Sequence, residues 1–268
     1  MELSKVAFIG GNGQLPSVLV RCVDIATELG CAHWLNVKSA NEIPDRYAVY
    51  FCIKPLLDAG ELYKLATRGR VIWDIIDFPP LDTRAISLYL TSTSAARDFF
   101  HRLGSIEVIP HHHCNISGVP GFPEHRRPGW VGHPYWCPNI PNLSFDRYNA
   151  VGMNRDDVVR AHRRIGIGLN LRSHNVGHDF HALINSGIKL INCIGFGLPS
   201  VSAREAPYLE IDSGYTCFTD EQDCAQSVRR LESDHGLYRE LRQACVASAN
   251  RFHIGTIADQ YRRLIEML

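Results

Sequence analysis

The fold of this chain is decided by residues 186–202, which run Ser186-Gly-Ile-Lys189-Leu-Ile-Asn192-Cys-Ile-Gly-Phe-Gly197-Leu-Pro199-Ser-Val-Ser202. The pattern predicts a helix that ends at Gly197, a tight turn through Pro199, and a short buried strand of small and β-branched residues. Lys189 and Asn192 are three positions apart, so they share one face near the start of that helix. A cation and an amide beside such a turn suit a bound phosphate and its sugar.

This segment resembles the donor-binding segment of GT-B glycosyltransferases, whose common pattern is Lys-x-x-Glu followed by Gly-x-Pro-Val. Lys189, Gly197 and Pro199 match that pattern, and Asn192 stands where the family has the acid. The resemblance implies that Lys189 contacts the diphosphate of a nucleotide-sugar and that residue 192 contacts its ribose. Asn can still bond a hydroxyl, but without the charge that strengthens the contact. The alternative is a core helix whose Lys189 only extends toward water.

Length and composition favour a globular α/β protein that binds its ligand locally. The 268 residues predict two compact domains or one large one, and 45% hydrophobic residues can form their cores. Lys+Arg and Asp+Glu both number 28, so no net charge favours nucleic acid or an acidic membrane. The chain has no long apolar run and no Cys-x-x-Cys among its nine cysteines, and its start, Met1 to Lys5, is polar. We therefore expect a cytoplasmic protein with reduced thiols and no transmembrane segment.

The amino-terminal part opens as a doubly wound α/β domain does, with a strand over 6–9, a glycine-rich turn, and a helix over 18–29. Gly11, Asn12 and Gly13 form that turn, and the GT-B resemblance implies that they face the donor cleft. Two alternatives remain. One is a plain tight turn, and the other is a dinucleotide-binding loop. The second lacks a third glycine, because Pro16 stands there, and no acid ends the next predicted strand.

Strands and helices continue to alternate along the chain, and their order resembles the GT-B architecture. We expect strands over 47–53, 70–77, 86–92, 106–109, 130–132, 164–171 and 215–218, and helices over 56–66, 94–103, 148–161, 221–232 and 237–268 with a break near 253–255. The expected fold class is α/β, with two Rossmann-like doubly wound domains facing a cleft and a carboxy-terminal helix crossing back to the first. The expected boundaries are 1–127 for the amino-terminal acceptor domain with its linker, 128–254 for the carboxy-terminal donor domain, and 255–268 for the terminal helix.

Sugar transfer from a nucleotide-sugar requires stabilisation of the negative charge on the departing diphosphate. Two cations can supply this without a metal ion, and Lys189 is the first. Arg172 follows a predicted strand, at the edge of the sheet where ligands bind, and is the second candidate. Ser202, at the end of the next strand, is a candidate hydrogen-bond donor to the phosphate, and Pro199 shapes the turn. The resemblance implies that Glu210 lines the donor pocket, although Arg172 and Glu210 also suit solvated surface positions.

An inverting transferase also needs a base that takes the proton of the acceptor hydroxyl. The resemblance places such a base at a strand end of the first domain. Asp77, at the end of a predicted strand, is one candidate and His111 is the other. A retaining enzyme needs no such base, and the sequence leaves both stereochemical courses open.

A histidine-rich segment invites a metal interpretation. Imidazole and thiolate are zinc ligands, but adjacent histidines cannot all face one ion, and no pair here has zinc-finger spacing. We expect no metal and no cofactor, and assign this segment to the linker or the cleft. Nearby aromatic residues can stack on a sugar or simply pack in the core. The residues in question are His111, His112, His113, Cys114, His125, Trp130, His133, Tyr135, Trp136 and Cys137.

The sequence therefore predicts a glycosyltransferase that moves a sugar from a nucleotide-sugar to a saccharide or other hydroxyl acceptor, without nucleic acid as a partner. A non-catalytic nucleotide- or carbohydrate-binding relative is the first alternative, favoured by Asn192. An NAD-dependent oxidoreductase using Gly11 and Gly13 is the second, and a nucleotide-sugar epimerase of GT-B fold is the third. The acceptor, the sugar, the nucleotide and the oligomeric state are not identified by these patterns.

Overall fold

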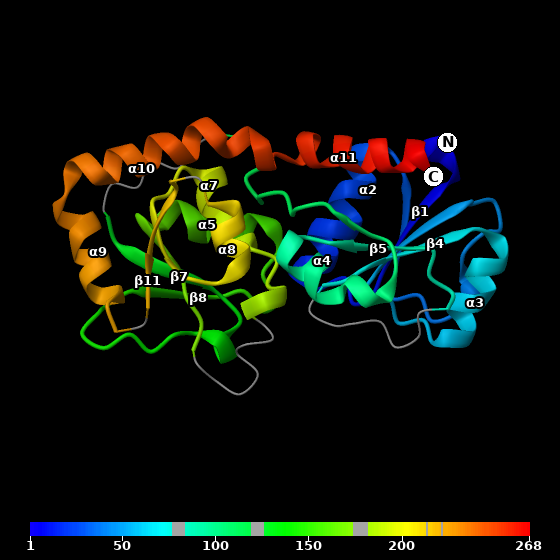
Figure 1. The fold of residues 1–268 in the computed structure, drawn as a ribbon, viewed down its shortest axis with the longest axis horizontal. Coiled ribbons are helices and arrows are strands. Elements are labelled where there is room, and N and C mark those ends of the chain that lie inside the picture. The colour runs from blue at the N-terminus through cyan, green and yellow to red at the C-terminus, as the bar shows by residue number, and fades with distance from the viewer. Residues whose placement is uncertain (77–83, 119–125, 174–181, 213, 221) are drawn as a thin grey trace. The chain divides into compact units, whose positions relative to one another are not determined.

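The computed structural model describes residues 1–76, 84–118, 126–173, 182–212, 214–220 and 222–268, and its contacts divide the chain into two compact units (Figure 1). Unit 1 contains Met1–His111 and Ile254–Leu268, and unit 2 contains His112–His253. The chain first passes from unit 1 to unit 2 after His111, whereas the sequence placed the end of the first domain, with its linker, at residue 127. Cys114 explains the earlier crossing, because it already packs against Phe196 and Leu198 in a core cluster of unit 2.

Unit 1 contains a parallel sheet of six strands in the order β2-β1-β3-β4-β5-β6. Every residue of β1, β3 and β5 is buried, and these strands are almost continuously apolar, as expected for a parallel sheet covered on both faces. The strand order reverses between β1 and β3, so the carboxyl ends of these two strands form the switch point of this sheet. The strands are β1 (Val6–Gly10), β2 (Ala32–Leu35), β3 (Val49–Ile53), β4 (Arg70–Asp74), β5 (Leu88–Thr91) and β6 (Ile106–Val108).

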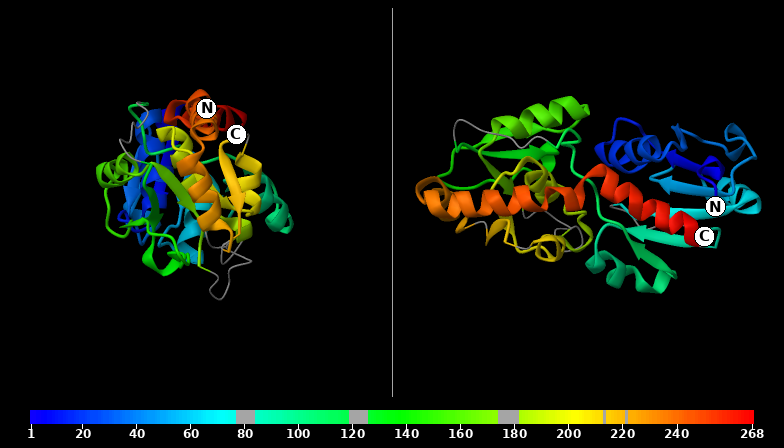
Figure 2. Two further views of the ribbon diagram at one scale, coloured as in Figure 1. Left: turned by 90° about the vertical axis from the view of Figure 1, so that its left-hand side faces the viewer. Right: turned by 90° about the horizontal axis from the view of Figure 1, so that it is seen from above.

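The helices of unit 1 include the last one of the chain. This terminal helix, α11, packs against α2, as Figures 1 and 2 show. The helix that follows β1 is continuous from Pro16 to Leu29, with a π-helical segment in its middle, and ends at Gly30 with φ 69°. The helices are α1 (Pro16–Val18), η2 (Leu19–Asp24), α2 (Ile25–Leu29), α3 (Ala59–Arg68), α4 (Ser94–Phe100), α11 (Ile254–Met267) and the short η1 (Leu3–Lys5), η3 (Ala40–Glu42) and η4 (His101–Leu103).

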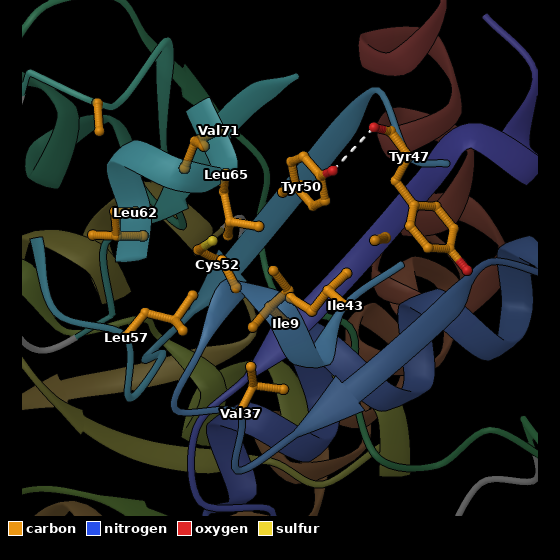
Figure 3. Packing of buried hydrophobic residues seen from close by; sticks show 13 residues of the cluster. Ile9, Val37, Ile43, Tyr47, Tyr50, Cys52, Leu57, Leu62, Leu65 and Val71 are labelled. Carbon is orange, nitrogen blue, oxygen red and sulfur yellow. Dashed lines mark hydrogen bonds between the residues drawn. The ribbon is translucent and has the colours of Figure 1, made fainter. Parts of the chain in front are cut away.

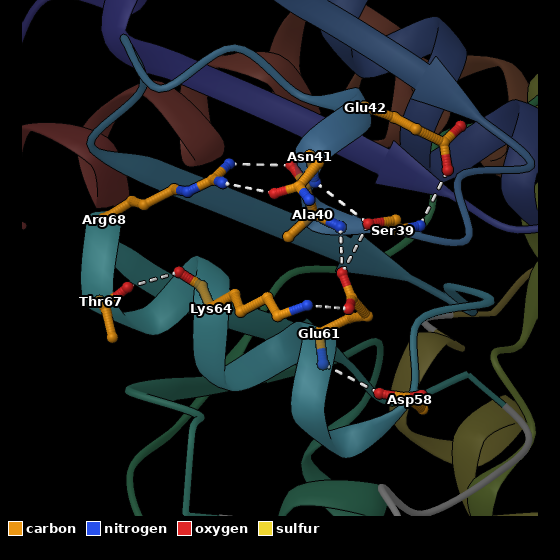
Figure 4. A network of polar contacts seen from close by, with 9 residues as sticks. All are labelled: Ser39, Ala40, Asn41, Glu42, Asp58, Glu61, Lys64, Thr67 and Arg68. Carbon is orange, nitrogen blue, oxygen red and sulfur yellow. Dashed lines mark hydrogen bonds and ion pairs between the residues drawn. The ribbon is translucent and has the colours of Figure 1, made fainter.

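The core on one side of this sheet is shown in Figure 3. Ile9 and Cys52 from the strands meet Leu62 and Leu65 from α3, and all four are nearly or completely buried. Outside this core, Glu61 of α3 ties down the loop between β2 and β3 (Figure 4). Its carboxylate accepts hydrogen bonds from the Ser39 hydroxyl at 2.9 Å and the Ala40 amide at 2.6 Å, so loop and helix are held together.

Unit 2 repeats the same topology with a parallel sheet of five strands in the order β8-β7-β9-β10-β11. Its switch point therefore lies between β7 and β9. The partly helical stretch predicted over 148–161 is confirmed from Arg155 onward, where α5 begins, whereas the strand β8, which ends at Asn149, was not predicted. The strands are β7 (Pro128–Gly132), β8 (Asp146–Asn149), β9 (Ile167–Asn170), β10 (Ser200–Ala203) and β11 (Thr216–Thr219).

The helix, turn and strand predicted for residues 186–202 are confirmed. Helix α7 is almost wholly buried and ends at Gly197, whose φ of 64° is the left-handed conformation that glycine tolerates best. Strand β10 follows Pro199 directly. No helix in the described part of the chain is long and apolar enough to cross a bilayer. Among the described residues, the helices of unit 2 include α5 (Arg155–Arg164), α7 (Ile188–Phe196), α8 (Ala206–Ile211), α9 (Cys224–Ser233), α10 (His235–Ser248), η5 (Pro134–Trp136) and η6 (Ala249–Phe252).

Gly195 in α7 allows the helix to pack against His113. A Cβ at position 195 would lie 2.3 Å from Cγ and 2.6 Å from Cβ of His113, which are the atoms of that side chain least able to move. We expect Gly195→Ala to destabilise the protein by about 1–3 kcal/mol, because overpacking outweighs the helix-propensity gain of about 1 kcal/mol.

Gly236→Ala in α10 is the matched control, since its new Cβ would meet only Asp234 Oδ1, at 3.3 Å. Urea unfolding of both variants tests the prediction. Equal stability of the two variants would contradict the assigned contact between α7 and His113.

Candidate functional site

The switch point of the unit 2 sheet is occupied by a lysine. Lys189 is the second residue of α7, and its stem lies against the end of β7, where a Cβ on Gly132 would be 3.3 Å from Lys189 Cε. Its Nζ lies 4.5 Å from the centroid of the Trp130 ring and donates to the carbonyl of Leu171, directly after β9, at 3.5 Å. The ammonium group is thus held between the ends of β7 and β9, where ligands of such sheets bind.

A second cation lies in the same region. Arg172 follows Leu171 at the carboxyl end of β9, with its guanidinium carbon 6.0 Å from the centroid of the Trp136 ring. Its Nε is 3.7 Å from Oε1 of Glu205, a distance that allows an ion pair but is too long for a hydrogen bond. The structure therefore brings together Lys189 and Arg172, the two cations singled out in the sequence, with Glu205 as their acid.

The charges of this site favour an added anion. Burial, and to a smaller extent Arg172, lower the pKa of Lys189 to about 7, and Glu205 opposes the change. The nine-residue helix α7 also directs its amino-terminal backbone N–H groups toward this end. An anion with several oxygens, such as a diphosphate, would stabilise both cations at once.

The local sequence patterns do not single out Glu205. It directly precedes α8 and its side chain is only 3% exposed. Its Oε2 accepts a hydrogen bond from Asn185 Nδ2 at 2.6 Å, and Asn185 Oδ1 accepts one from the Gly187 amide at 3.0 Å, which fixes the turn into α7. Pro207 was the available signal, because a proline in the first turn predicts a helix start and places Glu205 just before α8. Glu210, the predicted acid, is exposed on α8.

Three other predicted donor residues of unit 2 take part in internal structure. Asn192 is buried, and its Oδ1 accepts a hydrogen bond from the Cys114 amide at 2.9 Å. The hydroxyl of Ser202 is fully buried and accepts from Asn170 Nδ2 at 3.0 Å. Pro199 forms the turn between α7 and β10. Donor contact by these three residues stays a prediction.

The glycine-rich turn lies at the switch point of unit 1. Gly11 permits a close approach of strand ends, because a Cβ there would lie 1.9 Å from the carbonyl oxygen of Lys54. Asn12 Oδ1 accepts a hydrogen bond from the Gln14 amide at 2.9 Å, and Gly13 packs beneath Leu35. These contacts give the turn a structural role, and the predicted donor contact of Gly11, Asn12 and Gly13 stays a prediction.

The two predicted catalytic bases belong to unit 1. Asp77 lies outside the described residues. The strand expected over 70–77 is shorter in the structure, because β4 ends at Asp74. Asp74 is buried and forms an ion pair with Arg21 at 2.7 Å. His111 is buried, next to Pro110, whose carbonyl accepts a hydrogen bond from Arg21 at 3.1 Å. Both assignments stay predictions.

Two imidazoles of the histidine-rich segment make hydrogen bonds within unit 2. His113 Nε2 lies 3.1 Å from the carbonyl oxygen of Ala249, and His112 Nδ1 lies 2.9 Å from that of His113. Across the described ranges, no group of three or more His, Cys, Asp or Glu side chains is placed to hold a metal ion.

Solved structures of other proteins share this architecture over nearly their whole length. HepE of Anabaena, solved with UDP and glucose, is 14% identical, with 99% of this chain and 100% of that chain covered and a TM-score of 0.71. The fold is GT-B. A glycosyltransferase from Rickettsia africae is 8% identical over 97% of both chains, with a TM-score of 0.63. Sucrose-phosphate synthase from Thermosynechococcus elongatus is 10% identical over 98% of both, with a TM-score of 0.57.

No protein-family model and no curated protein matches the sequence. The similarity to solved structures establishes the GT-B fold predicted from residues 186–202. In this GT-B chain, the described cation pair lies at the switch point of the carboxy-terminal sheet.

Binding of a diphosphate should depend on pH through Lys189. With its pKa at about 7, this lysine is protonated below pH 7 and becomes neutral above it in the free protein. A bound diphosphate raises that pKa, so affinity should fall above pH 7, by up to about tenfold per pH unit. Titration calorimetry with UDP at pH 7, 8 and 9 measures this, in a range where the phosphates stay ionised.

Lys189→Arg is the matched control for this titration. Arginine keeps its charge over the whole range, so the affinity of that variant should be nearly constant. The same slope in both proteins would show that another group causes the pH dependence.

Proposed function

We propose that this protein is a glycosyltransferase that transfers a sugar from a nucleotide-sugar, with Lys189 and Arg172 holding the diphosphate. The observation that carries the proposal is a pair of cations that share one acid at the switch point of the unit 2 sheet. The fold gives further support, because HepE, which has the same fold, was solved with UDP-glucose as well as with UDP and glucose.

The geometry suits the chemistry of the departing group. The bond between the sugar carbon and the diphosphate oxygen breaks, and negative charge gathers on that oxygen. Lys189, Arg172 and the amino-terminal end of α7 present positive charge there in advance, which lowers the transition state more than the ground state. Two cations supply this stabilisation without a metal ion.

The acceptor completes the reaction. In our proposal a hydroxyl of a saccharide or another alcohol forms the new bond to the sugar carbon and gives up its proton. Unit 1 contains the predicted bases, Asp77 and His111, and an inverting reaction would use one of them. Asp77 and His111 are candidates because of their positions in the chain. Their assignment does not depend on the roles of Lys189 and Arg172.

A non-catalytic nucleotide-binding protein is the second candidate. It is favoured by Asn192, which replaces an acid of the family pattern and uses its amide oxygen to hold the Cys114 amide. Such a protein would keep the cation pair and bind nucleoside diphosphates without turning over a sugar donor.

Release of nucleoside diphosphate from nucleotide-sugars distinguishes the two candidates. The wild type and Lys189→Met are incubated with UDP-glucose and with the GDP-, ADP- and dTDP-sugars, and the released nucleotide is quantified. We expect slow release from one donor by hydrolysis, and loss of that release in the variant. Binding without release identifies the non-catalytic protein, and absence of both contradicts the proposed function.

A further inference from the structure

Three buried polar atoms beside the cation pair have no hydrogen-bond partner among the described residues. They are Arg172 Nε, Glu205 Oε1 and the Tyr208 hydroxyl. Tyr208 is completely buried on α8, and Glu205 is 4% exposed. The Tyr208 hydroxyl lies close enough to Asn185 and Arg172 for both to affect its pKa, but it makes no hydrogen bond of good geometry.

Such a cluster is unusual in a folded protein. More than about 90% of buried polar groups are hydrogen-bonded in native structures, and each unpaired group is costly. Here Arg172 Nε is a donor, Glu205 Oε1 is an acceptor, and the Tyr208 hydroxyl can be either. All three atoms lie in one site. Glu205 is also held firmly, because Asn185 occupies its Oε2. Its Oε1 lies 3.7 Å from Arg172 Nε, close enough for an ion pair but not for a hydrogen bond.

The chemistry of these atoms identifies the missing partner. Glu205 Oε1 requires a donor, whereas Arg172 Nε requires an acceptor. A hydroxyl group is both at once, and Tyr208 can bond it in either direction. A phosphate oxygen would satisfy Arg172 but would be repelled by the Glu205 carboxylate. The cluster therefore suits a neutral hydroxyl beside the anion that Lys189 and Arg172 attract.

We propose that Glu205, Tyr208 and Arg172 form a hydroxyl-binding subsite that selects ligands carrying a hydroxyl next to a diphosphate. This inference rests on the proposed function and refines its substrate class. A ribose hydroxyl of the nucleotide and a hydroxyl of the transferred sugar are the two sources of this group. Glu205 is thereby a specificity-determining residue of the site, and Tyr208 supports it.

Binding measurements with paired ligands test the subsite. Wild type, Glu205→Gln and Tyr208→Phe are titrated with UDP, 2′-deoxy-UDP, 3′-deoxy-UDP, UDP-glucose and inorganic pyrophosphate. We expect Glu205→Gln to weaken binding of the hydroxyl-bearing ligand at least tenfold. It should not weaken pyrophosphate binding, because the lost carboxylate repels the anion. The effect should vanish for the analogue that lacks the recognised hydroxyl, as in a double-mutant cycle.

The pattern of losses identifies the source of the hydroxyl. A loss seen with UDP and cancelled by one deoxyribose analogue assigns the ribose. A loss seen with UDP-glucose but not with UDP assigns the sugar. A loss of similar size for every ligand, pyrophosphate included, overturns the subsite and leaves the proposed function standing. Absence of any diphosphate binding by the wild type overturns both.

Tyr208→Phe keeps the test sound if Glu205→Gln folds poorly. It removes a buried hydroxyl that has no hydrogen-bond partner among the described residues, so the free variant should be at least as stable as the wild type. It should still bind the hydroxyl-bearing ligand, either UDP or UDP-glucose, about threefold to tenfold more weakly. Glu240→Gln, an exposed acid on α10, is the matched control and should change neither property.

Discussion

Lys189→Met should bind UDP at least a hundredfold more weakly than the wild type. The ammonium group lies at the switch point of the unit 2 sheet, 4.5 Å from the Trp130 ring centroid, and is held there by the Leu171 carbonyl. Removing one charge from a desolvated charge pair costs about 3 kcal/mol, which corresponds to roughly a hundredfold in Kd. Titration calorimetry at pH 6.5 measures the loss, with the exposed Lys38→Met as the control.

The same variant should not be destabilised in the absence of ligand. Burial lowers the pKa of Lys189 from 10.5 to about 7, so the unfolded chain binds one more proton than the folded chain between those values. The stability of the wild type therefore rises with pH across that window, and the burial cost of this lysine is greatest below pH 7. Lys189→Met should gain most in stability over the wild type at low pH. Lower stability of Lys189→Met than of the wild type at pH 6 would contradict the lowered pKa of Lys189.

Asp74→Ala should cost about 3–5 kcal/mol of unfolding free energy, because it leaves the buried Arg21 charge without its partner. The side chains of Arg21 and Asp74 are 0% and 2% exposed, and Nε and Oδ2 are 2.7 Å apart. Burial alone would lower the pKa of Arg21, but Asp74 and Tyr261 raise it, so the guanidinium stays charged. Arg21 also donates to the Ile109 carbonyl at 2.6 Å and thereby fixes the end of β6.

Two further variants separate burial from the ion pair itself. Asp98→Ala removes the acid of an exposed pair with Arg97 and should cost less than about 1 kcal/mol. The double variant Arg21→Met/Asp74→Leu has no orphaned charge and should be more stable than Asp74→Ala alone. Urea unfolding of all three compares them. A loss below about 1 kcal/mol for Asp74→Ala would mean that the pair is solvated in solution.

The fold was predictable where local chemistry determines it. Gly197 must end α7 because the chain turns left-handed there, and Pro199 then prevents the helix from continuing. Strand ends were less predictable. The apolar Ile75 and Ile76 extend the pattern of β4 beyond its last paired residue, Asp74, so the strand appeared to reach Asp77. Strand β8 was missed because its sequence, Asp146–Asn149, is polar. It is an edge strand whose residues alternate in exposure, so it lacks an apolar pattern.

The candidate site was only half visible in the sequence. Lys189 and Arg172 could be found because each lies at a position that a local pattern defines. Glu205 could not be assigned, because its contacts are with Asn185 and Arg172, 20 and 33 residues earlier in the chain. The bond from the Cys114 amide to Asn192 spans 78 residues and was equally hidden. Local spacing locates strand ends, but the partners of a buried acid depend on which strand ends become neighbours.

A crystal structure of the protein with UDP would test the central claim most directly. We expect the diphosphate at the start of α7, with its oxygens within hydrogen-bond distance of Lys189 Nζ and the Arg172 guanidinium. UDP bound elsewhere, for example at Gly11–Gly13 without contact to Lys189 or Arg172, would contradict the assignment of the donor site to unit 2.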